Sequence, residues 1–372
     1  MFTTDRRLGV EEELLLGDVA TGELRPLARE VLAACRPDGG REDGPEIKPE
    51  FFRAQLEVAT RPHTDVGAIR DELAGARARI AEVGTTLGVA PLAVPGPVLA
   101  TGSTGPGISP GDRYLAIEQH YAGVAGQSLM CALHVHVEVA DADEGVAVID
   151  RVRPWIPVLV ALSANSPFWS GGDTGYASWR SRVWNMWPTS GPAEPFGDAD
   201  GYHAFARSMV ATGAALDVAL INLDVRLSHR YPTVEFRVAD VCTDLDDAMV
   251  VAALARALVG HFAHRARAGD PPETWRVDEL RAAAWTAARF GLAGTLLSPT
   301  SRELVPAAAV VQQLLELVAT PLELAGDTER VRRGLAALAT RGTGADRQRA
   351  AWSAGGDLAA VVADIRERTL RV

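Results

Sequence analysis

Hydrophobic and polar residues alternate in several short segments of the first 240 residues, which predicts β-strands with one buried face. We expect strands at residues 6–16, 51–60, 89–94, 130–140, 217–226 and 232–240. Elsewhere apolar residues recur every three or four positions, the period of an amphipathic helix. This pattern predicts helices at residues 26–35, 64–87, 111–125, 144–163, 199–215, 243–268, 278–290, 301–319, 327–340 and 345–370.

The order of these elements favours an α+β architecture. Long helical insertions separate the predicted strands, and the strands do not follow a βαβ order, so we expect helices packed on one face of a single sheet. Residues 1–242 form the mixed, sheet-forming part and residues 243–372 the mainly helical part of one domain spanning 1–372. A long irregular stretch at 165–198 is typical of a binding loop.

Composition excludes several classes of protein. The hydrophobic share of 47% is ample for a core, and the net charge of −11 argues against a nucleic-acid or membrane-surface binder. The longest apolar run, residues 155–162, is too short to cross a membrane. The three dispersed cysteines suit neither a disulfide framework nor a cysteine zinc site, so we expect a cytoplasmic protein.

Acidic and imidazole side chains occupy one face of four predicted strands, because alternate strand residues share a face. They are Glu11 and Glu13, Glu57, His134 and His136, and Glu235 followed by Arg237. So many acids on one face would repel each other unless cations lay among them. The pattern indicates a metal–nucleotide site, although each strand alone would also fit an ordinary solvated face.

The residue types leave the metal open between two classes. Two acids on one strand face suit Mg²⁺, which prefers oxygen ligands. The His134-x-His136 spacing is also seen at zinc and iron sites, but no third nitrogen or sulfur ligand stands at a helpful spacing. A hard, oxygen-rich site therefore fits better.

Arginine is the expected phosphate-binding residue. The chain contains a single lysine, Lys48, and no Walker A sequence. Arg237, beside Glu235, has the planar fork that grips phosphate or carboxylate. Further candidates for binding nucleotide phosphates or an anionic substrate are Arg180, Arg182 and Arg226.

Several ordered motifs resemble those of the type 2 glutamate–cysteine ligase family, and most of all its YbdK-type carboxylate–amine ligases. They are Gly-Val-Glu-Glu-Glu at 9–13, Gln-Leu-Glu-Val-Ala-Thr at 55–60, Leu-His-Val-His-Val at 133–137, Ser-Ala-Asn-Ser-Pro-Phe-Trp at 163–169, Asp-Thr-Gly-Tyr-Ala-Ser at 173–178 and Thr-Val-Glu-Phe-Arg-Val-Ala-Asp at 233–240. Two positions depart from the family pattern: Glu138 stands where we expect glycine, and Gly171-Gly172 replaces a more polar stretch.

The resemblance implies a fold like the catalytic domain of glutamine synthetase, with a sheet similar to that of guanidino kinases. Helices would cover the convex side of a curved, mainly antiparallel sheet, and the concave face would hold Mg²⁺ and ATP. It also implies metal ligands, which would be Glu11, Glu13, Glu57, His134 and Glu235. Arg237 would contact phosphate.

The expected activity is that of an ATP-dependent carboxylate–amine ligase working through an acyl phosphate, with Arg237 and Arg182 as catalytic residues. Glutamate and an amine such as cysteine would be the substrates, and the resemblance suggests a homodimer. Three alternatives stay open: a guanidino kinase-like phosphotransferase, a zinc-dependent hydrolase using His134 and His136, and a non-catalytic nucleotide-binding module.

Overall fold

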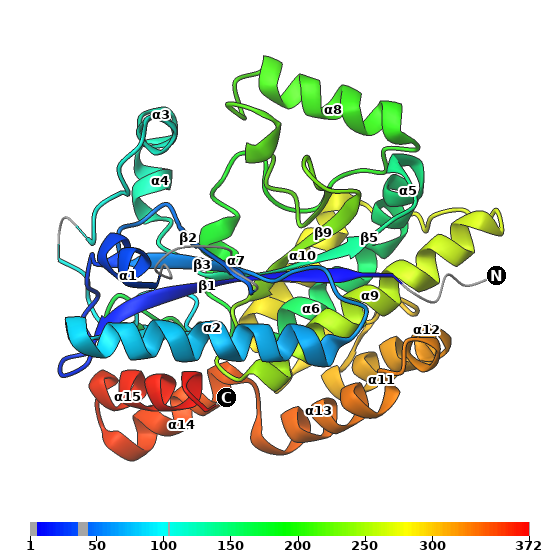
Figure 1. Ribbon diagram of the computed structural model, residues 1–372. Coiled ribbons are helices and arrows are strands. Elements are labelled where there is room, and N and C mark those ends of the chain that lie inside the picture. The colour runs from blue at the N-terminus through cyan, green and yellow to red at the C-terminus, as the bar shows by residue number, and fades with distance from the viewer. Residues whose placement is uncertain (1–5, 36–43, 103–104, 372) are drawn as a thin grey trace.

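The protein is built on a seven-stranded antiparallel sheet (Figure 1). The computed structural model describes residues 6–35, 44–102 and 105–371. The strands run in the order β2-β3-β1-β5-β9-β8, and β4 pairs with the second half of β1. Their bounds are β1 Leu8–Asp18, β2 Glu46–Pro49, β3 Gln55–Ala59, β4 Val89–Leu92, β5 Ala132–Glu138, β8 Val225–Leu227 and β9 Thr233–Asp240.

Two small hairpins lie outside this sheet. They are β6 Phe168–Trp169 with β7 Gly172–Asp173, and β10 Thr295–Leu297 with β11 Leu304–Pro306. The helices before the end of β9 are α1 Ala28–Cys35, α2 Val66–Leu87, α3 Asp112–Tyr121, α4 Gly123–Gln127, α5 Ala142–Val152, η1 Arg153–Trp155, α6 Ile156–Leu162, α7 Arg180–Trp184, α8 Ala199–Ala211 and η2 Val218–Leu220. The helices after it are α9 Leu245–Arg267, α10 Val277–Phe290, α11 Ala307–Leu317, α12 Ala319–Leu324, α13 Thr328–Arg341, α14 Gly344–Gly355 and α15 Leu358–Thr369.

The two faces of the sheet have different surroundings. We call the face that carries Glu11 and Glu13 the site face, and the opposite face, which carries Glu12, the helix face. Helices α2 and α9 lie along the helix face, while α3, α4 and α8 stand on the other side of the sheet (Figure 1). The expected α+β class with a mainly antiparallel sheet is confirmed.

Strand β1 shows why the chain folds this way. Its even-numbered residues from Leu8 to Leu14 are fully buried, whereas Gly9, Glu11 and Glu13 are only half-buried. Helix α2 then covers the buried face with Ile69, Leu73 and Ile80. Burying each such apolar side chain contributes about 1.5–3 kcal/mol, so this alternation fixes which face of the strand is turned inward.

Three of the predicted helices are interrupted. The helix expected at 111–125 divides into α3 and α4 at Ala122, whose φ is 46°. The one expected at 144–163 is interrupted by η1, and Pro154 in η1 and Pro157 in the first turn of α6 each remove a backbone donor. The last, expected at 345–370, ends its first half at Gly356 in the left-handed conformation.

Other boundaries were wrong as well, and the short strands β6, β7, β10 and β11 were missed. Residues 218–220 form a 3₁₀ turn capped by Asp217, so the strand expected at 217–226 begins only at Val225. The helix expected at 301–319 begins at Ala307, because residues 304–306 pair in a hairpin. The strand β2 was not predicted. In the described part of the chain, no helix is long and apolar enough to span a membrane.

Candidate active site

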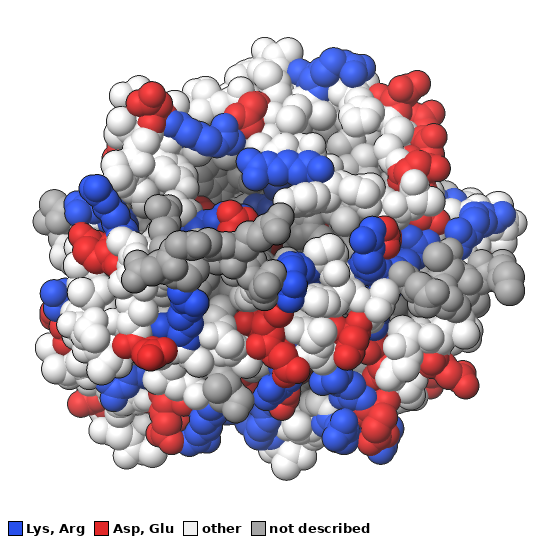
Figure 2. All heavy atoms as spheres, viewed as in Figure 1, with Lys and Arg blue, Asp and Glu red and all other residues white. Residues whose placement is uncertain are grey.

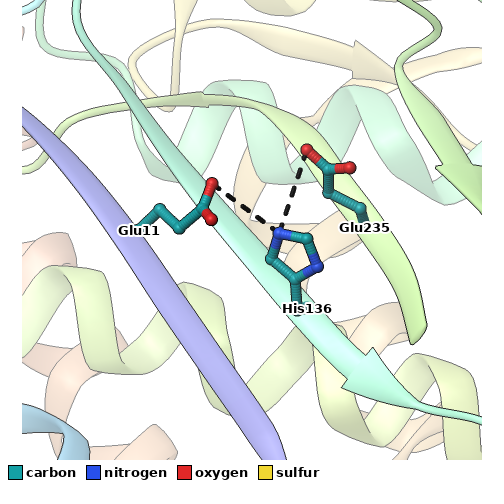
Figure 3. A group of neighbouring side chains, drawn as sticks. All are labelled: Glu11, His136 and Glu235. Atoms are coloured by element: carbon teal, nitrogen blue, oxygen red, sulfur yellow. Dashed lines mark ion pairs between the residues drawn. The ribbon is translucent and has the colours of Figure 1, made fainter. Parts of the chain in front are cut away.

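Three neighbouring strands bring Glu11, His136 and Glu235 together on the site face (Figure 3). Glu235 lies directly opposite His136 in the β5–β9 register, and Glu11 is opposite His134 in the β1–β5 register. The Nε2 atom of His136 lies 3.7 Å from Glu11 Oε2 and 3.9 Å from Glu235 Oε1. His134 Nδ1 is 3.4 Å from Glu11 Oε2. We call these residues the imidazole group.

A second group, which we call the acidic group, consists of Glu13, Glu50 and Glu57. Each has a carboxylate oxygen within 4.8 Å of the other two. Glu13 faces Glu57 across the β1–β3 ladder, and Glu50 precedes β3. The backbone N–H of Ala132 donates to Glu13 Oε2 at 2.8 Å, and Lys48 Nζ lies 2.7 Å from Glu57 Oε1. Among the described residues, Lys48 is the one side chain that forms an ion pair with this group.

Opposite charges stabilise the ionised carboxylates of the imidazole group. Burial would raise the pKa of Glu11, but hydrogen bonding with His134 and His136 lowers it well below its usual value. Burial is likewise outweighed at Glu235, whose pKa the guanidinium groups of Arg237 and Arg226 lower. Burial and then repulsion from Arg237 lower the pKa of His134 to about 4, so its imidazole is neutral near pH 7.

The acidic group shows the opposite shifts. Burial raises the pKa of Glu13 to about 7 in spite of the attraction of Arg180. Burial and repulsion from Glu11 raise the pKa of Glu57, and burial with repulsion from Glu13 and Glu57 raises that of Glu50 well above its usual value. A bound cation would relieve the repulsion among these three acids, which the neighbouring lysine offsets only in part.

The residues present fit a magnesium site better than a zinc site. Five carboxylates supply hard oxygen ligands across the two groups. The Nε2 atoms of His134 and His136 are buried and have no hydrogen-bond partner, so each offers a nitrogen that could bind a cation. The imidazole group has two nitrogen ligands, the acidic group has none, and neither contains a cysteine. Among the described residues, the site therefore lacks the third nitrogen or sulfur ligand typical of zinc.

Arg226 and Arg237 both contact Glu235. Arg226 donates from Nε to Glu235 Oε2 at 2.7 Å and from Nη2 to Oε1 at 3.2 Å, while its Nη1 donates to the carbonyls of Ala219 and Ile221. Each of the three guanidinium nitrogens of Arg226 therefore already donates to an acceptor within the protein. Arg237 Nη1 bonds to Glu235 Oε1, and its guanidinium lies 5.2 Å from the centre of the Trp184 ring.

Arg180 and Arg182 lie in different surroundings. Arg180 is 1% exposed and donates to the backbone carbonyls of Arg237 and Val238. Arg182 lines a cavity, and among the described residues no carboxylate lies within ion-pair distance of it. Its one side-chain hydrogen bond runs to Ser181 Oγ at 3.4 Å.

Two cavities are candidates for binding substrates. The first, about 360 Å³, is lined by Glu11, His136 and Lys48 together with Pro62 and Tyr231. The second, about 740 Å³, is lined by polar and aromatic side chains, among them Gln127, Trp169, Trp179 and Arg182. Figure 2 shows a hollow above the sheet, between α3–α4 and α8, with acidic atoms at its base and basic side chains along its upper rim.

The sequence matches the model of glutamate-cysteine ligase family 2 over residues 7–364. The chain belongs to this family. Its membership confirms the expected enzyme class, an ATP-dependent ligase. The motifs at 9–13, 55–60, 133–137 and 233–240, which helped to carry the resemblance, supply every member of the two groups except Glu50.

Similar proteins agree in length and fold. A Streptomyces coelicolor protein named "Putative glutamate--cysteine ligase 2" is 48% identical over 365 residues, covering 98% of this chain and 99% of the relative. A Streptomyces avermitilis protein named "Putative glutamate--cysteine ligase 2-1" is 45% identical over 366 residues, with the same two coverages. A crystal structure of glutamate–cysteine ligase from Francisella tularensis in complex with AMP superposes with a TM-score of 0.72 at 12% identity. It covers 100% of this chain and 89% of that one, and at this identity it shows the fold alone.

The structure brings together the five residues expected to bind metal, in two groups: Glu11, Glu235 and His134 in one, Glu13 and Glu57 in the other. Arg237 lies beside them. Arg226 is engaged with Glu235, Arg180 is buried and donates to backbone carbonyls of β9, and Arg182 lines the second cavity.

Glu50 and His136 were absent from the expected ligands. Strand alternation had placed His136 on the same face as His134, but of these two histidines the ligand set implied by the family resemblance included only His134. Glu50 is one residue outside the predicted strand at 51–60, and no periodic pattern marks it. Its approach to Glu13 depends on the turn between β2 and β3, which a single sequence does not reveal.

Proposed function

We propose that this protein activates the side-chain carboxylate of glutamate, or of a closely related acid, with ATP and joins it to an amine. The single observation that supports this best is the pair of carboxylate groups on one sheet face, one member of which, Glu11, also lines a cavity. A ligase of this kind must hold a nucleotide and an acid on opposite sides of the phosphoryl group being transferred.

We infer that Glu11, His134, His136 and Glu235 hold one Mg²⁺, and that Glu13, Glu50 and Glu57 hold another. Bound Mg²⁺ would neutralise charge on the β- and γ-phosphates. Arg237 adds a positive charge at the same place. Arg226 would support the Mg²⁺ site at the imidazole group by fixing the orientation of the Glu235 carboxylate. This role replaces the nucleotide contact expected from the sequence.

The cavities suggest which substrate goes where. In the first, the ring of Tyr231, which is 59% exposed, and Pro62 offer flat apolar surfaces suited to a purine base. In the second, Arg182 offers a guanidinium that forms no ion pair within 4.0 Å in the described part of the chain, suited to a substrate carboxylate. We therefore assign ATP to the first cavity and the acid and amine to the second.

The reaction then takes two steps. A carboxylate oxygen attacks the γ-phosphorus, the bond to the β-phosphate oxygen breaks, and ADP leaves. The amine nitrogen attacks the carbonyl carbon of the acyl phosphate, phosphate leaves with the bonding electron pair, and the nitrogen loses a proton. Arg237 would stabilise the charge on the phosphoryl oxygens.

A phosphate-release screen of glutamate and related acids against a panel of amines tests this proposal. We expect phosphate and ADP in equal amounts with an amide product identified by mass spectrometry, and no release when the acid is omitted. A stable phosphorylated acid without amide would instead identify a phosphotransferase. ATP-independent hydrolysis with stoichiometric zinc would identify a hydrolase, and nucleotide binding without turnover a non-catalytic module.

Three further expectations extend the proposal. We propose that residues 1–372 form one catalytic domain, which a single cooperative unfolding transition would support. We also propose a homodimer, to be tested by light scattering, and a cytoplasmic location, to be tested by cell fractionation.

A further inference from the structure

Strand β9 contains a bulge beside the imidazole group. Leu133 of β5 pairs with Ala239, but Val135 pairs with Phe236, so Arg237 and Val238 together lie opposite the single residue His134. A bulge leaves backbone groups without ladder partners and changes the direction of the side chains it carries. Here the Arg180 guanidinium donates to the two freed carbonyls, from Nη2 to Arg237 O and from Nη1 to Val238 O, each at 3.2 Å.

Asp240 stabilises the backbone around Arg180. The Asp240 carboxylate is completely buried and accepts three hydrogen bonds, from the backbone N–H of Asn165 at 2.9 Å, from Ser166 Oγ at 2.8 Å and from Ser178 Oγ at 2.9 Å. Ser166 Oγ in turn accepts from the backbone N–H of Arg180 at 3.0 Å. Asp240 therefore fixes both segments that hold Arg180.

Arg180 is a buried cation between two carboxylates. Burial lowers the pKa of Arg180, and the charges of Asp240 and Glu13 both oppose that change. Even so, Arg180 forms no ion pair within 4.0 Å with any carboxylate of the described chain, and its hydrogen bonds run to carbonyls. A guanidinium in ion-pair contact with Glu13 would occupy the oxygens that a cation needs.

We propose that Asp240 is a positioning residue that keeps Arg180 on the carbonyls of the β9 bulge and away from the Glu13 carboxylate. Its charge balances that of Arg180, so Glu13 stays available to a cation. The same contacts hold the bulge that directs Arg237 toward Glu235. This inference rests on the proposed cation site at Glu13.

Replacing Asp240 by asparagine tests the proposal. The amide keeps the shape of the side chain but removes its charge, so Arg180 should move toward Glu13. We expect Asp240→Asn to weaken Mn²⁺ binding about 10–100-fold, the usual effect of losing a group that orients a ligand. Electron paramagnetic resonance of Mn²⁺ measures this without ATP or any other substrate.

Asp150→Asn is the matched control. Asp150 is 3% exposed and accepts from the backbone N–H groups of Phe196 and Gly197, each at 2.8 Å, so like Asp240 it is a buried carboxylate held by hydrogen bonds, two in place of three. It contacts none of the residues of either group. We expect Asp150→Asn to lower the melting temperature, as Asp240→Asn does, without changing Mn²⁺ affinity.

A second substitution distinguishes positioning from a structural role. Adding Arg180→Met to Asp240→Asn removes the guanidinium that would block Glu13. We expect the double variant to bind Mn²⁺ at least about tenfold more tightly than Asp240→Asn alone, a non-additive result for residues in contact. Turnover stays low in the double variant, because the bulge has lost its donor.

Ser178→Ala is a milder variant for the case that Asp240→Asn does not fold, because it deletes only one of the three hydrogen bonds to Asp240. It should also weaken Mn²⁺ binding. Equal Mn²⁺ affinity in wild type and Asp240→Asn, or no recovery in the double variant, would overturn the inference alone. A wild-type protein that binds no Mn²⁺ would overturn the proposed cation site and the inference with it.

Discussion

Both faces of strand β1 carry glutamate, but the partners of these glutamates differ between the two faces. On the helix face, Glu12 is 0% exposed and forms a two-pronged ion pair with Arg77, at 2.6 Å to Nη2 and 3.0 Å to Nε. The remaining donors of Arg77 reach the carbonyls of Cys242 and Thr243. On the site face, Glu13 accepts from the backbone N–H of Ala132 and, at 3.3 Å, from the side-chain amide of Gln55. It also has two carboxylate neighbours.

This contrast separates structural acids from functional ones. Glu12 joins β1 to α2 and to the start of α9, and its hydrogen-bonding capacity is used within the protein. Glu13 lies among like charges, and burial holds its pKa near 7, an arrangement that adds little to folding and suits ligand binding. Adjacent positions of one strand therefore differ in function because the partners of each face differ.

Among the predictions that test this contrast, Glu12→Gln should have the largest effect, a loss of stability. Removing one partner of a buried ion pair leaves Arg77 with an uncompensated charge, which costs about 3–5 kcal/mol of unfolding free energy. Urea unfolding measures the change. The control is Glu30→Gln, an exposed acid on α1, expected within about 0.5 kcal/mol of wild type. A loss for Glu12→Gln no larger than that of Glu30→Gln would show that the pair contributes nothing to the fold.

Glu57→Gln should give the reverse result. Turnover, measured as Mg²⁺- and ATP-dependent ADP release, should fall at least about 100-fold, since losing a ligand exceeds the 10–100-fold effect of losing a group that orients one. The melting temperature should hold or rise, because one of three crowded acids has lost its charge. Undiminished turnover in a folded variant would refute the role proposed for Glu57.

Arg226→Lys tests whether fixing Glu235 matters beyond supplying a positive charge. Lysine keeps the charge but loses the fork that meets both oxygens of Glu235 and two backbone carbonyls. Turnover should fall about 10–100-fold. The control is Arg332→Lys on α13, where the same kind of fork meets Glu329 at the surface and the change should be neutral. Wild-type turnover from Arg226→Lys would mean that charge alone suffices there.

Strand alternation made much of the site predictable. The period of two placed Glu11 and Glu13 together and Glu12 on the other face of the strand. Alternation says nothing about which arginine reaches which acid. That is why Arg180 was expected at phosphate: its local sequence, rich in loop formers, does not show that its side chain is buried beneath the β9 bulge.

The remaining errors have local causes. Proline at 154 and 157 and glycine at 355 and 356 interrupt apolar patterns that would otherwise continue as helices. β2 was missed because four residues are too few to show a period, and Glu50 with it. The sheet order, in which β3 and β5 flank β1, arises from contacts between segments distant in sequence.

The smallest effect concerns protons and separates the two groups on the site face. The pKa of Glu13 is raised by burial to about 7, and those of Glu57 and Glu50 are raised too, whereas those of Glu11 and Glu235 are lowered. The acidic group thus holds protons near pH 6 that the unfolded chain has already lost. Unfolding free energy without metal should therefore fall as the pH rises toward 7.

A cation needs the ionised carboxylates, so it must displace these protons. Mn²⁺ affinity should rise about tenfold per pH unit between pH 5 and 7, since each proton displaced contributes one unit of slope. Calorimetry at pH 6 in two buffers of different ionisation enthalpy counts the protons released. Glu13→Gln should reduce that number, because it removes one acid and its repulsion of Glu50. Equal proton release from wild type and Glu13→Gln would place the titrating groups outside the acidic group, and the distinction between the two groups would then fail.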